Sequence, residues 1–393
     1  MRIQTIASFR EYLAALVFAI ECFPCISIIG QTSEQIDPPE PVESAKFSTP
    51  AERISSLLAE RFGFGAETIG GAKGVMTEIT SLTDDSLLKA ITDDTPRWIY
   101  FHPSLDGQTW MVPHGSTAFG KYKTVDGRGV SITWQYGIPN NNKGINLPPE
   151  KTPVKNGQLN AQKGQLILVG ITHVGDLGWP YAYESPWFSN GATDGLEIWG
   201  GQHYWIHKNT WKRMSDESLG VYHNGGTPDL VTFSKNIFLE TKTGSLIGNG
   251  TAAGSGRITI AYNLYNTMVN GRSPGEFRNM DAHVFNNVIG YVNDDGIRVG
   301  KNARVISEGN VFDMGCDSAV SGPRVIRYVI PDEKPRGILY SEGDIVSEKA
   351  STCPHTLDEG YITAPSPKPF QIPYKYKLLK SREEILKAVG TPR

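Results

Sequence analysis

The chain has 393 residues, a formal net charge of −3 and a charged fraction of 20%. This balance excludes the global basic field with which proteins attract nucleic acid. The 42 glycines, 25 prolines and 10% aromatic residues favour many short strands joined by turns over long helices. Length alone is compatible with two or three domains, but repetitive β folds of this size commonly form one.

Residues 1–30 have the features of a secretory signal peptide. Arg2 and Arg10 lie in a basic start, and a short apolar segment follows from Tyr12 to Ile20. That segment is too short to span a membrane, and a buried N-terminal helix is the alternative. We therefore expect a secreted, extracellular protein with no membrane anchor after cleavage.

The four cysteines are Cys22, Cys25, Cys316 and Cys353. The first two form a CxxC motif at the end of the signal and lack a second pair, which disfavours a metal site. Cleavage would leave Cys316 and Cys353, which form one disulfide or remain two thiols.

Residues 31–50 are polar and Pro-containing, and we interpret them as a flexible lead-in. A helix start follows, because Thr49 offers a hydroxyl cap before Pro50 and an acidic residue. Apolar residues at helical spacing extend this helix to Gly63. We expect it to cap one end of an open structure; an ordinary surface helix is the alternative.

The segment from Gly63 to Gly74 is rich in glycine, but it lacks the GxxxxGK[ST] pattern of a phosphate-binding loop. A short helix is predicted from Asp85 to Ile91, and a strand from Arg97 to Phe101.

From Leu166 onward, an Asn followed by two apolar or bulky residues recurs near the end of short alternating strands. It occurs at Asn209, Asn236, Asn263, Asn287 and Asn310. Successive positions differ by 27, 27, 24 and 23 residues, a period typical of solenoids. Because apolar residues alternate within each unit, the units are β coils whose strands pair in parallel with the next coil.

The recurring Asn suits a turn in the left-handed conformation, where its amide can bond the next Asn along the stack. We therefore predict an all-β protein, a right-handed single-stranded parallel β-helix, over residues 51–320. Residues 321–393 lose the period and form a Pro-rich tail with a helix from Ser381 to Val389. We expect this tail to fold back along the coils and end in a cap.

Three blocks carry a family resemblance: Gly63 to Phe101, the TVDGRG sequence from Thr124 to Gly129, and Asp194 to Asn287. Together they resemble family 1 polysaccharide lyases, the pectate lyases and their pectin lyase relatives, over residues 60–320. The resemblance implies calcium-dependent β-elimination on polygalacturonate. A base removes the C5 proton of a uronate, the C4–O4 bond breaks, and an unsaturated sugar results.

The resemblance also implies site residues. The loop from Asn270 to Arg278 is similar to the family pattern R-x-P-x-x-R, which makes Arg272 the catalytic base and Arg278 a partner of a substrate carboxylate. Lys242 precedes a Leu-Ile-Gly sequence, as does the substrate-binding lysine of the family. A base must lie within hydrogen-bond reach of C5, and cations must neutralise the uronate.

Calcium requires several hard oxygen ligands. Asp194 matches the second Asp of the family's D-x-D motif, whose first Asp is Ala192 here. Asp216 and Glu217 match a second acidic motif, in which Glu217 is the preferred ligand. A further Asp expected four residues after Glu217 is Val221.

A second departure replaces the family's Asp-His pair by His207 and Lys208. The leading hypothesis is a secreted, monomeric pectate lyase with bound Ca²⁺. Two alternatives are a pectin lyase that cleaves methylated pectin without calcium and a non-catalytic polygalacturonate-binding protein.

Overall fold

A computed structural model describes residues 47–113, 115–136, 158–175, 193–250, 254–266, 272–290, 296–313, 327–351 and 361–390. All of them belong to one compact unit, Pro41–Arg393. The predicted signal peptide, nearly all of the lead-in, and Cys316 and Cys353 lie outside these residues. No helix in the described ranges has the length and apolarity needed to cross a membrane.

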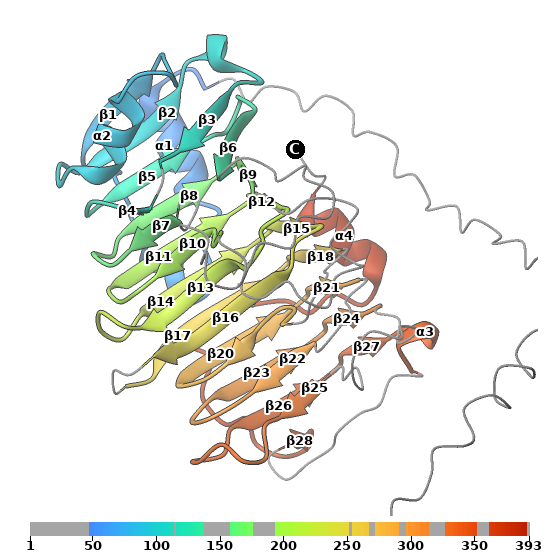
Figure 1. Cartoon of the computed structure of the whole chain (residues 1–393). Helices are drawn as coiled ribbons and strands as arrows, with labels where there is room; N and C mark the ends of the chain where they lie inside the picture. Colours follow the sequence, from blue (N-terminus) through green and yellow to red (C-terminus); the bar gives the residue numbers. More distant parts are fainter. Residues whose placement is uncertain are drawn as a thin grey trace, which may run out of the picture. The chain divides into compact units, whose positions relative to one another are not determined.

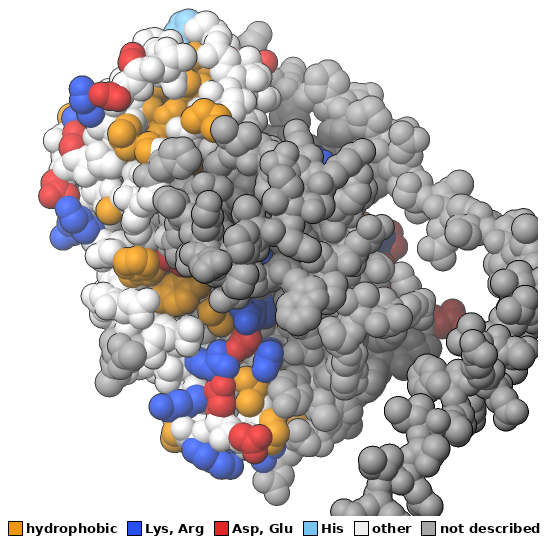
Figure 2. All heavy atoms as spheres, viewed as in Figure 1, with side chains coloured by type: hydrophobic (Ala, Val, Ile, Leu, Met, Phe, Trp, Pro, Cys, Tyr) orange, Lys and Arg blue, Asp and Glu red, His pale blue; other side chains and the backbone are white. Residues whose placement is uncertain are grey.

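The strands form three sheets, A, B and C, in which every pairing is parallel (Figure 1). Apart from the two ends of sheet A, each strand pairs with the strands three places earlier and later in the chain. Each coil thus contributes one strand to every sheet. This is the predicted single-stranded parallel β-helix. One face of the unit carries basic and acidic side chains close together (Figure 2).

Sheet A contains β1 (Val75–Ile79), β2 (Arg97–Phe101), β5 (Lys123–Asp126), β8 (Leu166–Val169), β11 (Gln202–His207), β14 (Asp229–Ser234), β17 (Gly256–Ala261), β20 (Met280–Phe285), β23 (Arg304–Glu308), β26 (Ile338–Glu342) and β28 (Tyr361–Thr363). Sheet B contains β3 (Thr109–Val112), β6 (Ile132–Tyr136), β9 (Ile171–Val174), β12 (Thr210–Lys212), β15 (Ile237–Leu239), β18 (Leu264–Asn266), β21 (Val288–Ile289), β24 (Val311–Phe312) and β27 (Ile345–Val346). Sheet C contains β4 (Ser116–Ala118), β7 (Gln158–Ala161), β10 (Leu196–Ile198), β13 (Glu217–His223), β16 (Thr243–Gly250), β19 (Glu276–Phe277), β22 (Ile297–Val299) and β25 (Arg327–Val329).

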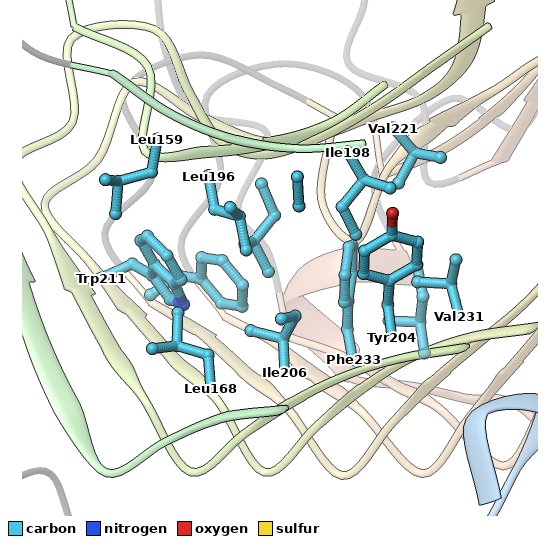
Figure 3. Packing of buried hydrophobic residues seen from close by; sticks show 14 of the residues in the cluster. Leu159, Leu168, Leu196, Ile198, Tyr204, Ile206, Trp211, Val221, Val231 and Phe233 are labelled. Atoms are coloured by element: carbon cyan, nitrogen blue, oxygen red, sulfur yellow. The ribbon is translucent and has the colours of Figure 1, made fainter. Parts of the chain in front are cut away.

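The hydrophobic core lies between the sheets, where inward side chains of successive coils stack (Figure 3). Leu168, Ile206 and Phe233 occupy equivalent positions in β8, β11 and β14 and are all fully buried. Burying one such side chain contributes about 1.5–3 kcal/mol. The alternation of apolar residues in the sequence therefore indicates a core in which each coil places side chains at equivalent inward positions.

The predicted asparagine ladder is confirmed. Asn236 donates its backbone N–H and its amide Nδ2 to Asn263 Oδ1, at 2.8 and 3.1 Å, and Asn263 repeats both bonds to Asn287. The left-handed conformation, however, belongs to the residue before each ladder asparagine. Lys235 has φ 53° and Tyr262 has φ 58°. That turn directs the following amide inward, along the stack.

The ladder continues to a residue that the repeat did not identify. Asn310 donates its backbone N–H and Nδ2 to Asp344 Oδ1, at 2.8 and 3.1 Å. Asp344 Oδ2 in turn accepts hydrogen bonds from Ser307 and Arg327. The strands β25 to β28 extend the parallel sheets beyond residue 320, where the sequence analysis places the tail. The period is lost there because the last coil is longer and an Asp replaces the Asn.

The first helix, α1 (Pro50–Leu58), begins as predicted: Thr49 Oγ1 accepts a hydrogen bond from Glu52 N at 3.1 Å. It ends before Gly63. Leu57 packs against Trp98 and Trp205 in a separate cluster on the outer side of sheet A. The prediction that this helix caps one end of the coil stack is therefore wrong, because the helix covers an outer face of sheet A.

The second helix, α2 (Ser86–Thr92), takes that position instead. Leu87 and Ile91 are fully buried, and with Ala90 they join the central core cluster beside Ile99 of β2. Because β1 and β2 begin sheet A, this helix covers apolar side chains at the N-terminal end of the coil stack.

The Gly-rich segment, with the short 3₁₀ helix η1 (Phe64–Glu67), lies flat against the outer face of sheet A. Gly65 N donates to Thr232 Oγ1 at 2.8 Å, and Gly71 N donates to Thr124 Oγ1 at 3.0 Å. A Cβ on Gly71 would lie 1.7 Å from the Arg97 carbonyl oxygen. The glycines are thus required by close backbone approach.

The remaining short helices are η2 (Pro103–Leu105) and α3 (Glu348–Ser351). The last helix, α4 (Arg382–Val389), begins one residue later than predicted and ends at the predicted residue; the Ser381 hydroxyl caps it by accepting from Glu384 N. Its buried residues Ile385 and Val389 pack against Val288 and Val311 on the outer side of sheet B. The tail therefore folds back along the coils as predicted, but its helix covers a flank of the stack.

The tail reaches that flank across sheet A, where it covers a buried polar cluster around Glu308. Lys368 Nζ and the Tyr376 hydroxyl donate hydrogen bonds to the Glu308 carboxylate at 2.6 and 2.8 Å, and His283 Nε2 lies 3.0 Å from it. Burial raises the pKa of Glu308, but these hydrogen bonds outweigh burial and lower the pKa to about 2.

This cluster predicts an acid-sensitive step in stability. Because the folded pKa of Glu308 is below the ordinary 4.5, its contribution is present above pH 4.5 and is lost as pH falls toward 2. We expect Glu308→Gln to lower the free energy of unfolding at pH 7 by about 2–3 kcal/mol and to flatten this acid dependence. Thermal unfolding from pH 7 to pH 2.5 measures both effects.

The matched control is Glu342→Gln, because the Glu342 side chain is 43% exposed and lies 3.7 Å from the same Lys368. We expect little change in this variant. An equal loss in both variants would show that general surface charge, and not the Glu308 cluster, holds the tail.

Candidate active site

The predicted site residues gather at the N-terminal ends of adjacent sheet C strands. Glu217 begins β13, Lys242 directly precedes β16, and Asp194 lies two residues before β10. Backbone bonds align these ends: Gly195 N donates to Glu217 O at 2.9 Å. Parallel stacking of coils, with strands about 4.8 Å apart, thus brings residues from three coils together.

Three carboxylates form a cluster here. One carboxylate oxygen each of Asp194, Asp216 and Glu217 lies within 4.8 Å of the others. Asp194 and Glu217 are buried, and Asp216 is partly buried. The second acidic motif predicts Glu217 rather than Asp216 as a ligand, and the structure brings both to the cluster. Lys242 Nζ lies 3.9 Å from Asp216 Oδ1 at its edge.

The electrostatics of the cluster fit a divalent cation. Burial, reinforced by the negative charges of Asp216 and Asp194, raises the pKa of Glu217 to about 9, although Arg272 acts in the opposite direction. Hard carboxylate oxygens at this spacing are the donors that Ca²⁺ prefers. A bound cation would relieve their mutual repulsion and keep all three ionised.

Arg272 borders the cluster directly. Its Nη1 lies 2.5 Å from Glu217 Oε1, and its Nε lies 3.0 Å from Glu276 Oε2. The Arg272 side chain is 35% exposed, so one side of the guanidinium remains open to solvent. Arg272 has a φ of 64°, in the left-handed region, where the loop turns toward β19.

Arg278 lies further along the same face. Its Nε and Nη2 contact Glu333 Oε1 at 2.9 and 2.5 Å, and its Nη1 contacts Glu276. Burial lowers the pKa of Arg278, but the pairs with Glu333 and Glu276 outweigh burial and raise it. The Arg278 guanidinium is thus paired with two carboxylates, those of Glu276 and Glu333.

The arginine loop departs from the family pattern in length. Three residues separate Pro274 from Arg278, where R-x-P-x-x-R has two. The residue at the pattern's second arginine position is Phe277, which is fully buried in the core. Strand alternation points Phe277 inward and its neighbours outward. Arg278 therefore lies one position later than the pattern requires.

The His-Lys pair that departs from the family motif lies on another sheet than the carboxylate cluster. His207 and Lys208 are at the end of β11 in sheet A, where both contact Glu60 Oε2, at 3.2 and 2.5 Å. Glu60, which follows α1, is thus the acid beside this pair, where the family motif has an Asp. Val221 is fully buried in the core and offers no ligand (Figure 3). Ala192 lies outside the described residues.

Sequence reasoning missed three charged residues of this face: Glu276, Arg298 and Glu333. Glu276 lies between Arg272 and Arg278 in the sequence, and this position could have indicated that it pairs with them. Glu333 is 55 residues from Arg278 in sequence, and no local pattern connects the two.

Comparison with known proteins finds similarity to one family over this site. The sequence pattern of the pectate lyase family matches residues 171–326, which include all six predicted site residues. A protein of Arabidopsis thaliana that carries a pectate lyase name is 28% identical over 296 residues, covering 70% of this chain and 69% of that protein. The chain is therefore similar to the pectate lyases over the residues that form this site. The pectate lyases are polysaccharide lyases.

Three further similarities were found. A pectin lyase of Pectobacterium carotovorum is 35% identical to this chain over 130 residues, 30% of this chain and 40% of that protein. Among solved structures, the cedar pollen allergen jun a 1 superposes with a TM-score of 0.62 at 18% identity, covering 85% of this chain and 93% of the allergen. A pectate lyase of Bacillus sp. N165 in complex with trigalacturonate gives a TM-score of 0.51 at 18% identity, covering 84% and 97%. These structural similarities support the β-helix fold.

Proposed function

We propose that the protein is a secreted pectate lyase that cleaves de-esterified homogalacturonan by calcium-assisted β-elimination. The observation that carries the proposal is the contact between Arg272 and a cluster of three carboxylates on sheet C, in a chain similar to the pectate lyases. The trigalacturonate complex of the Bacillus enzyme supports an oligogalacturonate as the ligand.

Asp194, Asp216 and Glu217 would hold the calcium ion. Bound there, Ca²⁺ supplies positive charge that neutralises the uronate carboxylate and makes its C5 proton more acidic. The cluster is buried on one side and open beside Asp216, whose side chain is 19% exposed. Substrate oxygens and waters would complete the coordination shell.

Arg272 is the proposed base. In its neutral form the Arg272 side chain takes the C5 proton and becomes a guanidinium. The electron pair left on C5 forms the C4–C5 double bond, and the C4–O4 bond breaks with its electrons passing to O4, which takes up a proton. Lys242, with an ammonium group at the edge of the cluster, binds a uronate carboxylate. Arg278 binds the carboxylate of a second uronate, which replaces Glu333 or Glu276 as a partner of its guanidinium.

Calcium removal tests the proposal most directly. We expect polygalacturonate to yield the ultraviolet-absorbing unsaturated product, and a chelator to lower the rate by about 10²-fold or more, since the metal supplies several kcal/mol of charge stabilisation. Adding Ca²⁺ back should restore the rate. Full activity in chelator would contradict the calcium assignment.

A pectin lyase is the second candidate, because the local identity of 35% is to a pectin lyase. A neutral methyl ester needs no metal bridge, so this activity should persist in chelator on highly methylated pectin. Product from methylated pectin alone would favour this candidate. No product from either substrate, together with retained polygalacturonate binding, would indicate a binding protein.

A further inference from the structure

Glu276 is a buried carboxylate that contacts three arginines. It lies on β19 with 3% of its surface exposed. Its Oε2 is 3.0 Å from Arg272 Nε and 3.5 Å from Arg298 Nη1, and its Oε1 contacts Arg278 Nη1. Neither the family pattern nor the proposed reaction assigns this residue a role.

The contacts continue as a row of alternating charge. Glu217 pairs with Arg272, Arg272 with Glu276, Glu276 with Arg278, and Arg278 with Glu333. The row leads from the carboxylate cluster toward the C-terminal coils. Basic and acidic side chains lie close together on the face that Figure 2 shows. Arg272 and Arg278 are each held by two acids, which fixes the plane of each guanidinium.

Arg298 is the third arginine that contacts Glu276, and it lies in the next coil, on β22. The register of β19 and β22 places Arg298 directly beside Glu276. Its neighbours Ile297 and Val299 are fully buried in the core, so alternation directs Arg298 outward. Arg272 and Arg278 flank β19 in one coil, Arg298 lies in the next, and all three contact Glu276. Several cations on one face suit the repeated carboxylates of a polyuronate chain.

Stability alone is a poor reason for this arrangement. A buried ion pair gains little over apolar packing, because both charges lose their hydration. Three adjacent guanidiniums would also repel one another if no acid separated them. A single carboxylate among them offsets the repulsion and directs each side chain.

We propose that Glu276 is a positioning residue, which holds Arg272, Arg278 and Arg298 in the orientation that meets the uronate chain. The proposal rests on the proposed lyase function. Glu276 does not touch the substrate; it acts through the arginines. A displacement of about 1 Å of a catalytic group can cost on the order of 10²-fold in rate.

The test compares Glu276→Gln with the control Glu240→Gln. Glutamine keeps the shape of the side chain and removes its charge. Glu240 accepts an equivalent contact, from Arg213 Nε at 2.8 Å, at a turn after β15. We expect Glu276→Gln to lower kcat/KM on polygalacturonate by about 10–100-fold, with a loss in kcat through Arg272. The control should match the parent. An unchanged kcat would overturn the proposal.

A second measurement does not depend on turnover. The labelling rate of each arginine with phenylglyoxal, followed by mass spectrometry, reports how firmly its guanidinium is held. In Glu276→Gln, Arg272 and Arg278 should be labelled at least several-fold faster than in the parent, whereas Glu240→Gln should change Arg213 alone. Equal labelling rates in parent and Glu276→Gln would overturn the positioning role.

The two readouts separate failure of this inference from failure of the proposed function. A parent protein that yields no product from either substrate contradicts the lyase proposal, and the labelling rates still decide the role of Glu276. If Glu276→Gln fails to fold, Glu276→Asp keeps the charge one methylene shorter. In Glu276→Asp, the labelling rates of Arg272 and Arg278 should exceed the parent rates, and kcat should be lower than that of the parent. Parent-like values of both would overturn the proposal.

Discussion

Arg272→Ala should lower turnover of polygalacturonate by on the order of 10³-fold, the range measured when a general base is removed. Arg272 is the arginine that touches the carboxylate cluster, at 2.5 Å from Glu217, and its exposed side faces solvent. The fold should survive, because the residue lies in a loop before β19 and its side chain is 35% exposed. Rates of product absorbance and a thermal unfolding curve, each in saturating Ca²⁺, measure the two effects.

The control for this variant is Arg213→Ala. Arg213 has the same 35% side-chain exposure and a comparable contact, with Glu240, but lies beyond β12 of sheet B. We expect its turnover to equal that of the parent. Arg272→Lys separates charge from geometry, because lysine keeps the charge and loses the planar fork. Unchanged turnover in Arg272→Ala would remove its catalytic role, whatever the effect on calcium affinity.

Asn263→Ala should cause the largest loss of stability. Asn263 is fully buried; it accepts two hydrogen bonds from Asn236 and donates two to Asn287. Its Nδ2 also donates to the Phe233 carbonyl oxygen at 3.1 Å. Alanine would leave the buried Asn236 backbone N–H without its acceptor, at about 1–3 kcal/mol. It would also remove one hydrogen bond from Asn236 Nδ2, which keeps Ile206 O, and one from the Phe233 carbonyl oxygen. We expect the free energy of unfolding to fall by about 3–5 kcal/mol, measured by denaturant unfolding.

Asn249→Ala is the matched control for the ladder. Asn249 lies near the end of β16 and is exposed, so its amide has water as an alternative partner. Its substitution should change stability by less than about 0.5 kcal/mol. A similarly small effect at Asn263 would show that stacked apolar residues hold the coils without the amide ladder.

The sequence by itself determined the features that repeat or are local. The asparagine spacing and the alternation of apolar residues predicted a parallel β-helix, because each coil must present the same inward faces to its neighbours. The cap of α1 was also readable, since Thr49 bonds an amide only three residues away. The six candidate site residues came from family motifs that are short and contiguous.

Only the tertiary structure decided which charges meet. Glu333 reaches Arg278 across 55 residues, and Glu60 reaches His207 across 147. Asp344 ends the asparagine ladder from a coil whose length departs from the period. Such pairs arise because stacking makes neighbours of residues whole coils apart, and ion pairs between outward side chains require no repeat in the sequence. For that reason the ladder and the arginine loop were predictable, whereas the acids that hold those arginines were not.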